Sequence, residues 1–487
     1  MTLAYHNQQS DYRYKWHVMA TVGIGVLLGT IDGSIVNVAL PTLVRELHTQ
    51  FAAVQWVVLA YLLTIATLML SIGRLADMVG KKKLYMTGML VFTGGSALCG
   101  MATSIEWLIS ARVIQGVGAA MMTALGAAIL TQAFPPSQRG RVLGINGAVV
   151  SIGIIIGPVV GGLLIASLSW HWIFLVNIPI GIAGAIMARR YVPAGMAQTS
   201  GQRFDYPGAG LLFILLLSLM LAMTLGQRLG FGAPLVLALA CISTIALGLF
   251  IAVENKSSCA IVDIRLFHNV ELSMNLFNGF ITFVVLGGTI ILMPFYLENV
   301  LGYSPRHTGI LLAVVPIALG ITSPISGALS DRFGANIITL CGLSMLLVGL
   351  LGLSTLGKET SAMHYILLYL PSGIGMGLFQ SPNNSAIMGS APAEKTGIVS
   401  GLLALTRTLG QTTGVAMIGA LWAALVSYFS MQQGGNISHV SVEAQVSAIN
   451  YTFKIMSGLV VFAIILTLLV RRKQVMQKRS TIDVPAN

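Results

Sequence analysis

Residues 19–41 read MATVGIGVLLGTIDGSIVNVALP, an apolar run that carries a single carboxylate, Asp32. The run has about the 20 residues that a helix needs to cross a bilayer. An ionised Asp near the centre of such a helix costs roughly 2.5 to 3.5 kcal/mol, so a carboxylate placed there usually serves a function. Its small or polar neighbours Gly33, Ser34 and Asn37 are typical of a face turned toward a cavity. Asp32 is therefore the first candidate site residue; a structural carboxyl that stays protonated or bonds a neighbouring helix is the alternative.

The whole chain has the composition of an integral membrane protein. Of its 487 residues, 55% are hydrophobic and only 9% are charged, against roughly 25% charged in soluble proteins. Lipid leaves backbone groups no partner outside the segment, so these runs predict helices, and they lack the alternation of barrel strands. We expect an all-α protein with fourteen spans, near 18–40, 51–72, 84–103, 107–131, 141–166, 171–188, 206–226, 232–253, 274–297, 307–329, 336–356, 363–388, 397–424 and 452–470.

The basic residues predict the orientation. A net charge of +12 could indicate nucleic acid, but a nucleic-acid binder gathers its cations on one soluble face. Here most of the 27 Lys and Arg residues lie in alternate connections, such as Lys81–Lys83 and Arg471–Lys473. Because positive connections stay inside, both termini are expected in the cytoplasm.

Several other functions lack their sequence signals. The four cysteines show no CxxC or His-Cys spacing, so we expect neither a disulfide framework nor a metal site. No GxxxxGK[ST] loop is present, so a nucleotide is not the expected energy source. With no nucleophile-base constellation, an enzyme is disfavoured, and no cofactor is expected.

An internal repeat predicts the domain organisation. Gly73, Asp77 and Gly80 recur as Gly327, Asp331 and Gly334, and Gly153 and Gly157 recur at nearly the same offset as Gly410 and Gly414. Such a parallel repeat is typical of secondary transporters that bind substrate between two homologous halves. We expect a six-helix bundle over 1–190, an inserted helix pair over 191–260 and a second six-helix bundle with a tail over 261–487.

The connection after span two, GRLADMVGKKK over 73–83, predicts a cytoplasmic gate. Its glycines permit a tight turn, and its carboxylate can accept hydrogen bonds from a helix N-terminus or a cation. Positive-inside charge alone would explain the lysines but not the second occurrence of the pattern. The predicted gate residues are Gly73, Arg74, Asp77, Gly80, Lys81, Gly327, Asp331, Arg332 and Gly334.

This loop resembles the signature of the major facilitator superfamily. Three further stretches, LGTIDGSIVNVALP over 28–41, GIIIGPVVGG over 153–162 and WHWIFLVNIPIG over 170–181, are similar to the drug:proton antiporter family with fourteen spans. The resemblance implies a major facilitator fold in a bacterial inner membrane and export of amphipathic, often cationic compounds coupled to protons. It implies a small-molecule substrate, a lipid bilayer, no nucleic acid and a monomer.

Span five and span four carry the next candidates. Gly153, Gly157 and Gly161 make a flat face for close helix packing, and Pro158, followed by Gly162 in the same motif, bends the helix. A bend beside a close contact suits a moving interface; a static interface would also use the glycines but has less use for Pro158. Arg112 and Gln115 enter span four from the outside, with Arg112 about 8 Å below the surface and Asp32 about 13 Å below it. A long Arg side chain could therefore reach Asp32, and the resemblance gives such an arginine a part in proton coupling; a structural Arg is the alternative.

The remaining candidates are less specific. Arg407 is the only charge deep in the second half, and it could meet an anionic group or bond backbone carbonyls. Glu298 is either an interfacial residue or a second protonatable site. Analogy with the family suggests Trp56, Tyr61, Gln380, Asn383 and Asn384 as further cavity residues. The substrate cavity that we predict comprises Asp32, Asn37, Trp56, Tyr61, Gln115 and Arg407.

The resulting prediction is a multidrug efflux antiporter in which Asp32 and Arg112 couple proton entry to export. Exporting a specific metabolite, lipid or siderophore, with Arg407 serving an anionic group, is the alternative within the same fold. A transport-inactive scaffold or sensor is the alternative from another class; intact signatures in both halves argue against it.

Overall fold

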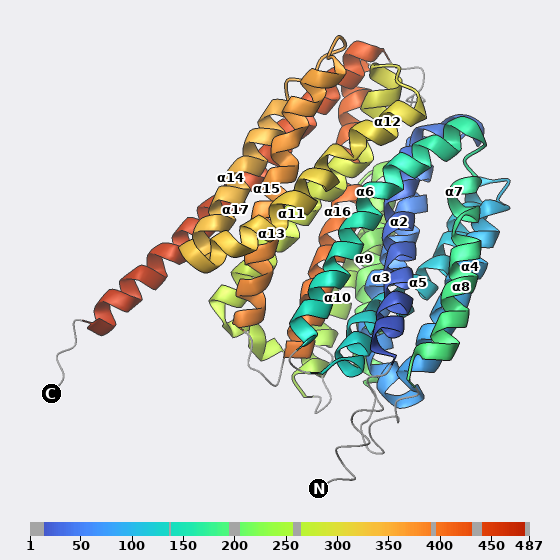
Figure 1. The fold of residues 1–487 in the computed structure, drawn as a ribbon. Coiled ribbons are helices and arrows are strands. Elements are labelled where there is room, and N and C mark those ends of the chain that lie inside the picture. Colours follow the sequence, from blue (N-terminus) through green and yellow to red (C-terminus); the bar gives the residue numbers. More distant parts are fainter. Residues whose placement is uncertain are drawn as a thin grey trace, which may run out of the picture. The chain divides into compact units, whose positions relative to one another are not determined.

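The computed structural model describes residues 14–135, 138–193, 205–256, 264–390, 396–430 and 441–482, and these residues contain helices and turns but no strand (Figure 1). The predicted all-α class is thereby confirmed. The first half comprises α2 (Lys15–Glu46), α3 (Phe51–Val79), α4 (Lys81–Gly100), α5 (Ile105–Ala133), α6 (Arg139–Ser167), α7 (Trp172–Leu175), α8 (Asn177–Tyr191), α9 (Tyr206–Leu229) and α10 (Pro234–Glu254). The second comprises η2 (Ile264–His268), α11 (Val270–Phe295), η3 (Tyr296–Val300), α12 (Pro305–Leu312), α13 (Val314–Phe333), α14 (Ala335–Leu353), α15 (Ala362–Gly389), α16 (Thr396–Ser430) and α17 (Val442–Ile482).

Thirteen helices within these described ranges are long and apolar enough to cross a membrane. They coincide with all but one of the predicted spans, and three of them are interrupted, between α7 and α8, α11 and η3, and α12 and α13. The predicted span at 84–103 corresponds to α4, which is not among the thirteen. Its first turn consists of three lysines, Lys81 to Lys83, which lowers the mean hydropathy of a helix of only 20 residues.

Contacts between Cα atoms divide the chain into two compact units. Unit 1 contains residues 1–261, 293–313 and 415–420, and unit 2 contains 262–292, 314–414 and 421–487. In unit 1, α2 packs against α5, α6 and α8, α4 packs against α5 and α8, and α12 packs against α6. The predicted inserted pair, α9 and α10, packs as a hairpin whose first helix contacts α3. In unit 2, α15 packs against α13 and α14, and α14 also contacts α17.

The repeat seen in the sequence has a structural counterpart in each unit. Gly80 is the single residue between α3 and α4, and Gly334 is the single residue between α13 and α14; their φ angles are 98° and 88°. Side chains other than hydrogen rarely adopt this left-handed region, so glycine is required at both turns. The glycines of α6 pack on α2, and Gly410 and Gly414 of α16 pack in the same way against backbone carbonyls of α11.

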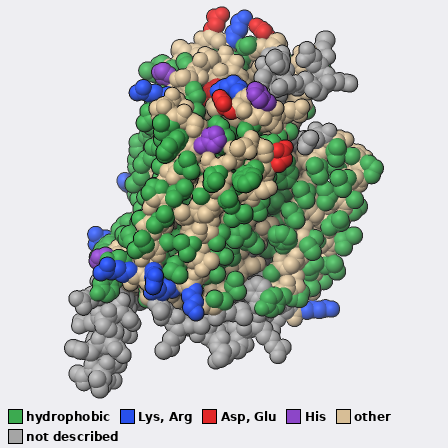
Figure 2. All heavy atoms as spheres, turned by 90° about the vertical axis from the view of Figure 1, so that its right-hand side faces the viewer, with side chains coloured by type: hydrophobic (Ala, Val, Ile, Leu, Met, Phe, Trp, Pro, Cys, Tyr) green, Lys and Arg blue, Asp and Glu red, His purple; other side chains and the backbone are tan. Residues whose placement is uncertain are grey.

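Large apolar side chains remain exposed on the outer helices. Figure 2 shows hydrophobic side chains covering much of the visible face. On α10, which is mostly exposed, Leu235, Leu237, Ile242, Ile245, Leu247, Leu249 and Ile251 all face outward. A soluble protein rarely exposes so much contiguous apolar surface, whereas a lipid-facing helix requires it.

Candidate functional site

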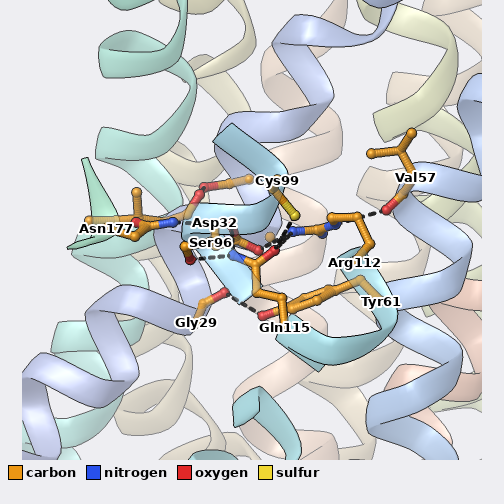
Figure 3. Close-up of polar contacts among 12 residues, drawn as sticks. Gly29, Asp32, Val57, Tyr61, Ser96, Cys99, Arg112, Gln115 and Asn177 are labelled. Carbon is orange, nitrogen blue, oxygen red and sulfur yellow. Dashed lines mark hydrogen bonds and ion pairs between the residues drawn. The ribbon is translucent and has the colours of Figure 1, made fainter. Parts of the chain in front are cut away.

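Asp32 lies at the centre of a buried polar cluster in unit 1 (Figure 3). Its side chain is fully buried, and both carboxylate oxygens accept hydrogen bonds. Oδ1 accepts from Gln115 Nε2 at 2.7 Å and from Asn177 Nδ2 at 3.2 Å, while Oδ2 pairs with Arg112 Nη1 at 2.5 Å. The carboxylate is therefore neutralised by a cation and held by two amides, which offsets much of the free energy lost when its hydration is removed.

Arg112 is equally buried, with only 1% of its surface exposed. Besides Asp32, its guanidinium donates from Nε to Val57 O at 2.9 Å and from Nη1 to Gln115 Oε1 at 2.6 Å. The Tyr61 ring lies beneath it, with its centroid 4.0 Å from Cζ. An aromatic face attracts a desolvated cation by about 2 kcal/mol, so Arg112 would keep several stabilising contacts if Asp32 became neutral.

Gln115 links the two charges. Its Nε2 donates to Asp32 and, at 2.8 Å, to Ser96 Oγ, while its Oε1 accepts from Arg112 and from Cys99 Sγ at 3.6 Å. The amide can satisfy a carboxylate with its nitrogen and a guanidinium with its oxygen only in this orientation. A change in the charge of Asp32 would therefore affect α4 as well as α5, because Gln115 of α5 also hydrogen-bonds Ser96 and Cys99 of α4.

Local sequence explains how these groups meet. Arg112 and Gln115 are three residues apart on α5, so they lie on one helix face. At Gly95 of α4 an added Cβ would lie 2.6 Å from the Cα of Gln115. Only glycine permits this approach, and Ser96 follows directly in the chain. The close contact between α4 and α5 thus positions the Ser96 hydroxyl against the Gln115 amide.

The structure brings four of the seven predicted coupling and cavity residues together. Asp32, Arg112, Gln115 and Tyr61 form one cluster, in which the Tyr61 hydroxyl also donates to Gly29 O at 3.4 Å. Asn37 donates to Gly33 O of its own helix at 3.0 Å, and its Oδ1 has no partner among the described residues. Trp56 is half-buried on α3 outside these contacts, and Arg407 belongs to unit 2.

Three cluster members, Ser96, Cys99 and Asn177, were not predicted from the sequence. Asn177 was the most accessible to prediction, because it is a lone amide between Val176 and Ile178 in the stretch that resembles the entry of span six. Ser96 and Cys99 are small residues that occur in any apolar helix, so their positions carry no signal. The described residues contain no group of three His, Cys, Asp or Glu side chains that could hold a metal ion.

The predicted antiporter helix packs on the helix that carries Asp32. Added Cβ atoms at Gly153, Gly157 and Gly161 of α6 would collide with Thr30, Ser34 and Ile35 of α2, respectively. The Ser34 hydroxyl lies 3.4 Å from Gly153 O and bonds it. The next face of α6, at Pro158 and Gly162, meets Gly309 and Pro305 of α12 in the same unit. Close approach at the glycine face is thus confirmed, whereas its movement stays a prediction.

The predicted cytoplasmic gate is described only in part. Gly73, Arg74 and Asp77 lie in the last turns of α3, and the side chains of Arg74 and Asp77 fall outside the described part of the structure. In the second copy, Asp331 and Arg332 are exposed at the end of α13, where Arg332 lies 5.4 Å from the ring centroid of Phe333. Gly327 faces Ser381 of α15. The gating role of these residues stays a prediction.

Comparison with known proteins decides the family. Residues 22–415 match the Major Facilitator Superfamily. The chain belongs to this superfamily. It is 34% identical to the riboflavin transporter RibZ of Clostridioides difficile (strain 630), covering 95% of this chain and 98% of the relative. It is also 34% identical to the multidrug resistance protein Stp of Mycobacterium tuberculosis (strain CDC 1551 / Oshkosh), over 84% of this chain and 76% of the relative.

Solved structures of the superfamily share the fold. The crystal structure of a bacterial homologue of the human lysosomal transporter Spinster, in an inward-facing and unoccupied conformation, superposes with a TM-score of 0.66 at 17% identity, covering 94% of this chain and 97% of that one. The major facilitator fold predicted from the sequence is confirmed. The protein is therefore a multi-pass membrane transporter of small molecules rather than an enzyme.

Proposed function

We propose that the protein is a proton-coupled exporter of amphipathic, mainly cationic compounds that works by alternating access. The observation that carries the proposal is the ion pair of Asp32 and Arg112, fully buried within membrane-spanning helices. A buried intramembrane carboxylate in a transporter typically serves as a proton carrier. Relatives named for multidrug resistance, Stp and the multidrug transporter MdtP of Bacillus subtilis, which is 31% identical, support this substrate class.

The cluster suggests how a proton would act. Protonation of Asp32 removes the negative charge beside Arg112, whose guanidinium then depends on Val57 O, Gln115 Oε1 and the Tyr61 ring. The two protonation states therefore favour different arrangements of α2 and α5. A proton moving inward releases about 2.3 kcal/mol per 100 mV, which can drive the less favourable step of the cycle.

The structure refines the predicted part of Asp32 in substrate binding. The side chain is closed off from solvent and its charge is already balanced by Arg112. A neutral pair attracts a cation weakly, so Asp32 can act as a counter-ion for substrate only after α2 and α5 move apart. We propose that the ionised, separated Asp32 binds the cation and that proton uptake then neutralises Asp32, which lowers its affinity for the cation.

The setting of the transporter completes the proposal. We place it as a monomer in a bacterial inner membrane with both termini in the cytoplasm, because most basic residues lie in the connections on that side. The proton gradient, rather than a nucleotide, is the energy source.

A second candidate is export of one specific metabolite. RibZ, a riboflavin transporter by name, matches over nearly the whole chain. Arg407 of α16, whose Nε has no hydrogen-bond partner among the described residues, would suit an acidic group that a purely cation-selective exporter has no use for. The two candidates differ in substrate charge and share the same fold and the same Asp32 cluster.

Proton release from purified protein in liposomes tests the proposal. Cationic dyes, quaternary ammonium biocides and anionic metabolites are added in turn to the native protein, to Asp32→Asn and to Glu106→Gln, a control that removes an exposed acid from the helix that carries Arg112. We expect cations to exchange for protons in the native and control proteins but not in Asp32→Asn. Retained exchange in folded Asp32→Asn refutes the coupling role, and exchange driven only by anions favours the second candidate.

A further inference from the structure

We propose that Arg407 forms an anion subsite inside unit 2 that binds a carboxylate or phosphate group of the transported compound. The inference rests on the proposed export function and narrows its substrate class to amphipathic compounds that carry an acidic oxygen group beside their cationic group, that is, zwitterions. Arg407 lies eleven residues after Thr396, the first residue of α16, or about 17 Å along the helix at 1.5 Å per residue.

Within the described part of the chain, no anion balances Arg407. Its Nε is buried without a hydrogen-bond partner, and none of the described residues forms an ion pair with it. The contact that the structure records is with the Phe283 ring of α11, whose centroid is 5.7 Å from Cζ. The guanidinium therefore lies against an aromatic face with its Nε donor unused, in a residue that is half-buried.

An unused guanidinium at this depth calls for a ligand. Arginine stays charged in proteins, and a charged side chain within a membrane-spanning helix is costly and usually pairs with another group. Arg112 shows how the same chain offsets this cost, with Asp32, Gln115 Oε1 and Val57 O as acceptors. Arg407 has no comparable set, so the group that balances it comes from outside the described chain.

The repeat shows that the fold does not need this charge. Gly410 of α16 corresponds to Gly153 of α6, so Arg407 corresponds to Val150. Both glycines pack closely on a neighbouring helix, α11 in one unit and α2 in the other. Because α6 achieves this packing with an apolar residue at the equivalent position, a purely structural role does not account for Arg407.

A second unpartnered group lies against the same helix. Asn383 of α15 is 2% exposed, and its Oδ1 has no hydrogen-bond partner. Its Nδ2 is 3.4 Å from the place of a Cβ at Gly279, one helical turn before Phe283 on α11. The amide oxygen would accept a donor from the compound whose oxyanion meets the guanidinium. The two groups therefore lie against α11 at positions one helical turn apart.

A matched pair of ligands tests the subsite in the purified full-length protein. An amphipathic xanthene dye is titrated as its free carboxylate and as its methyl ester, in nanodiscs of neutral lipid. The native protein should bind the carboxylate about tenfold more tightly than the ester, since a charge-assisted hydrogen bond contributes about 1.5 kcal/mol or more.

The variants should change this preference in different ways. Arg407→Gln should bring the ratio of the two affinities to about one, with the affinity for the ester unchanged. Arg407→Lys should keep part of the preference. The control Arg306→Gln, which removes an exposed arginine, should keep all of it.

Three results would overturn the inference. A native protein without preference for the carboxylate has no anion subsite, and a variant that loses both dyes equally assigns Arg407 a structural role. In nanodiscs with anionic lipid, loss of the preference through competition by the lipid would assign the site to a headgroup phosphate instead of the transported compound. If Arg407→Gln does not fold, a lowered ratio in Arg407→Lys decides the question. Proton exchange driven by the ester in Arg407→Gln would show that the proposed export function holds independently.

Discussion

Arg112 and Arg407 both lie within membrane-spanning helices, but their charges are balanced in different ways. Arg112 is surrounded by a carboxylate, an amide oxygen, a backbone carbonyl and an aromatic face. Arg407 contacts an aromatic ring but no acceptor among the described residues. A charge that is paired with a buried partner can be neutralised only if the interactions of its partner change too, whereas an unpaired charge can be balanced by binding a ligand. The first arrangement suits proton coupling and the second suits substrate recognition.

Breaking the buried pair of Asp32 and Arg112 from one side should be more harmful than removing both charges. We expect Arg112→Leu to lower the free energy of unfolding by about 3 to 5 kcal/mol, because it leaves an uncompensated buried carboxylate. The double variant Asp32→Asn/Arg112→Leu should recover most of this loss. Unfolding in detergent, monitored through the loss of helical signal, measures the free energy of unfolding of both variants. A double variant as unstable as the sum of the two single variants would show that the charges are not coupled.

At the residue scale, charge in an apolar run was the signal that could be read from the sequence. Asp32 and Arg112 stand out because an ion in lipid is costly, and helical rise alone places them at similar depth. Asn177 and Ser96 do not stand out, because neutral polar side chains are common in spans. Their contacts depend on how α4, α5 and α8 are arranged around α2, which no local pattern specifies.

At the scale of the element, the α2–α6 contact connects the glycine motif to the site. Gly157→Ala should disturb this contact, because the new Cβ meets the Ser34 side chain two residues from Asp32. Gly144→Ala is the matched control on the same helix, where an added Cβ meets nothing within 4 Å. We expect the control to be neutral or stabilised by up to about 1 kcal/mol, as alanine favours helix over glycine. Lower thermal stability and lower efflux in Gly157→Ala alone would support the contact, and equal behaviour of the two variants would contradict it.

Hydropathy predicted the helices well but not their interruptions. A run of apolar residues determines whether a segment crosses the membrane, and it says nothing of backbone geometry within the span. The breaks at Val176 and Ala313 lie three residues before Pro179 and Pro316, and the π-helical turn at Tyr296–Val300 follows Pro294. Their signal is therefore proline, which disrupts a helix, and not hydropathy. Such turns often occur at functional sites. Gly80 and Gly334 were predictable as turns because their left-handed conformation requires a particular residue type.

At the scale of the whole molecule, the chain passes between the two units within its ninth and tenth spans. Residues 262–292 cluster with unit 2, 293–313 with unit 1 and 314–414 again with unit 2. Within unit 1, the segment 293–313 is held by Arg45 Nη2, which meets Glu298 Oε2 at 2.9 Å, and by an edge-on contact of Phe51 with Phe295 at 4.9 Å. Together with the packing of α12 on α6, these contacts hold the segment 293–313 within unit 1.

The ion pair of Arg45 and Glu298 should respond asymmetrically to mutation. The Glu298 side chain is 2% exposed and the Arg45 side chain 48%, and Glu298 Oε1 has no partner among the described residues. Arg45→Ala leaves a buried carboxyl unpaired, which should lower stability by about 1 to 3 kcal/mol. Glu298→Gln leaves an arginine that water can solvate, so its loss should be smaller. Thermal unfolding in detergent compares them with Lys358→Ala and Glu443→Gln, which break a pair exposed on both sides and should change little either way. Equal losses of stability for Arg45→Ala and Glu298→Gln would mean that the stabilising contribution comes from the pair itself and not from the burial of its carboxylate.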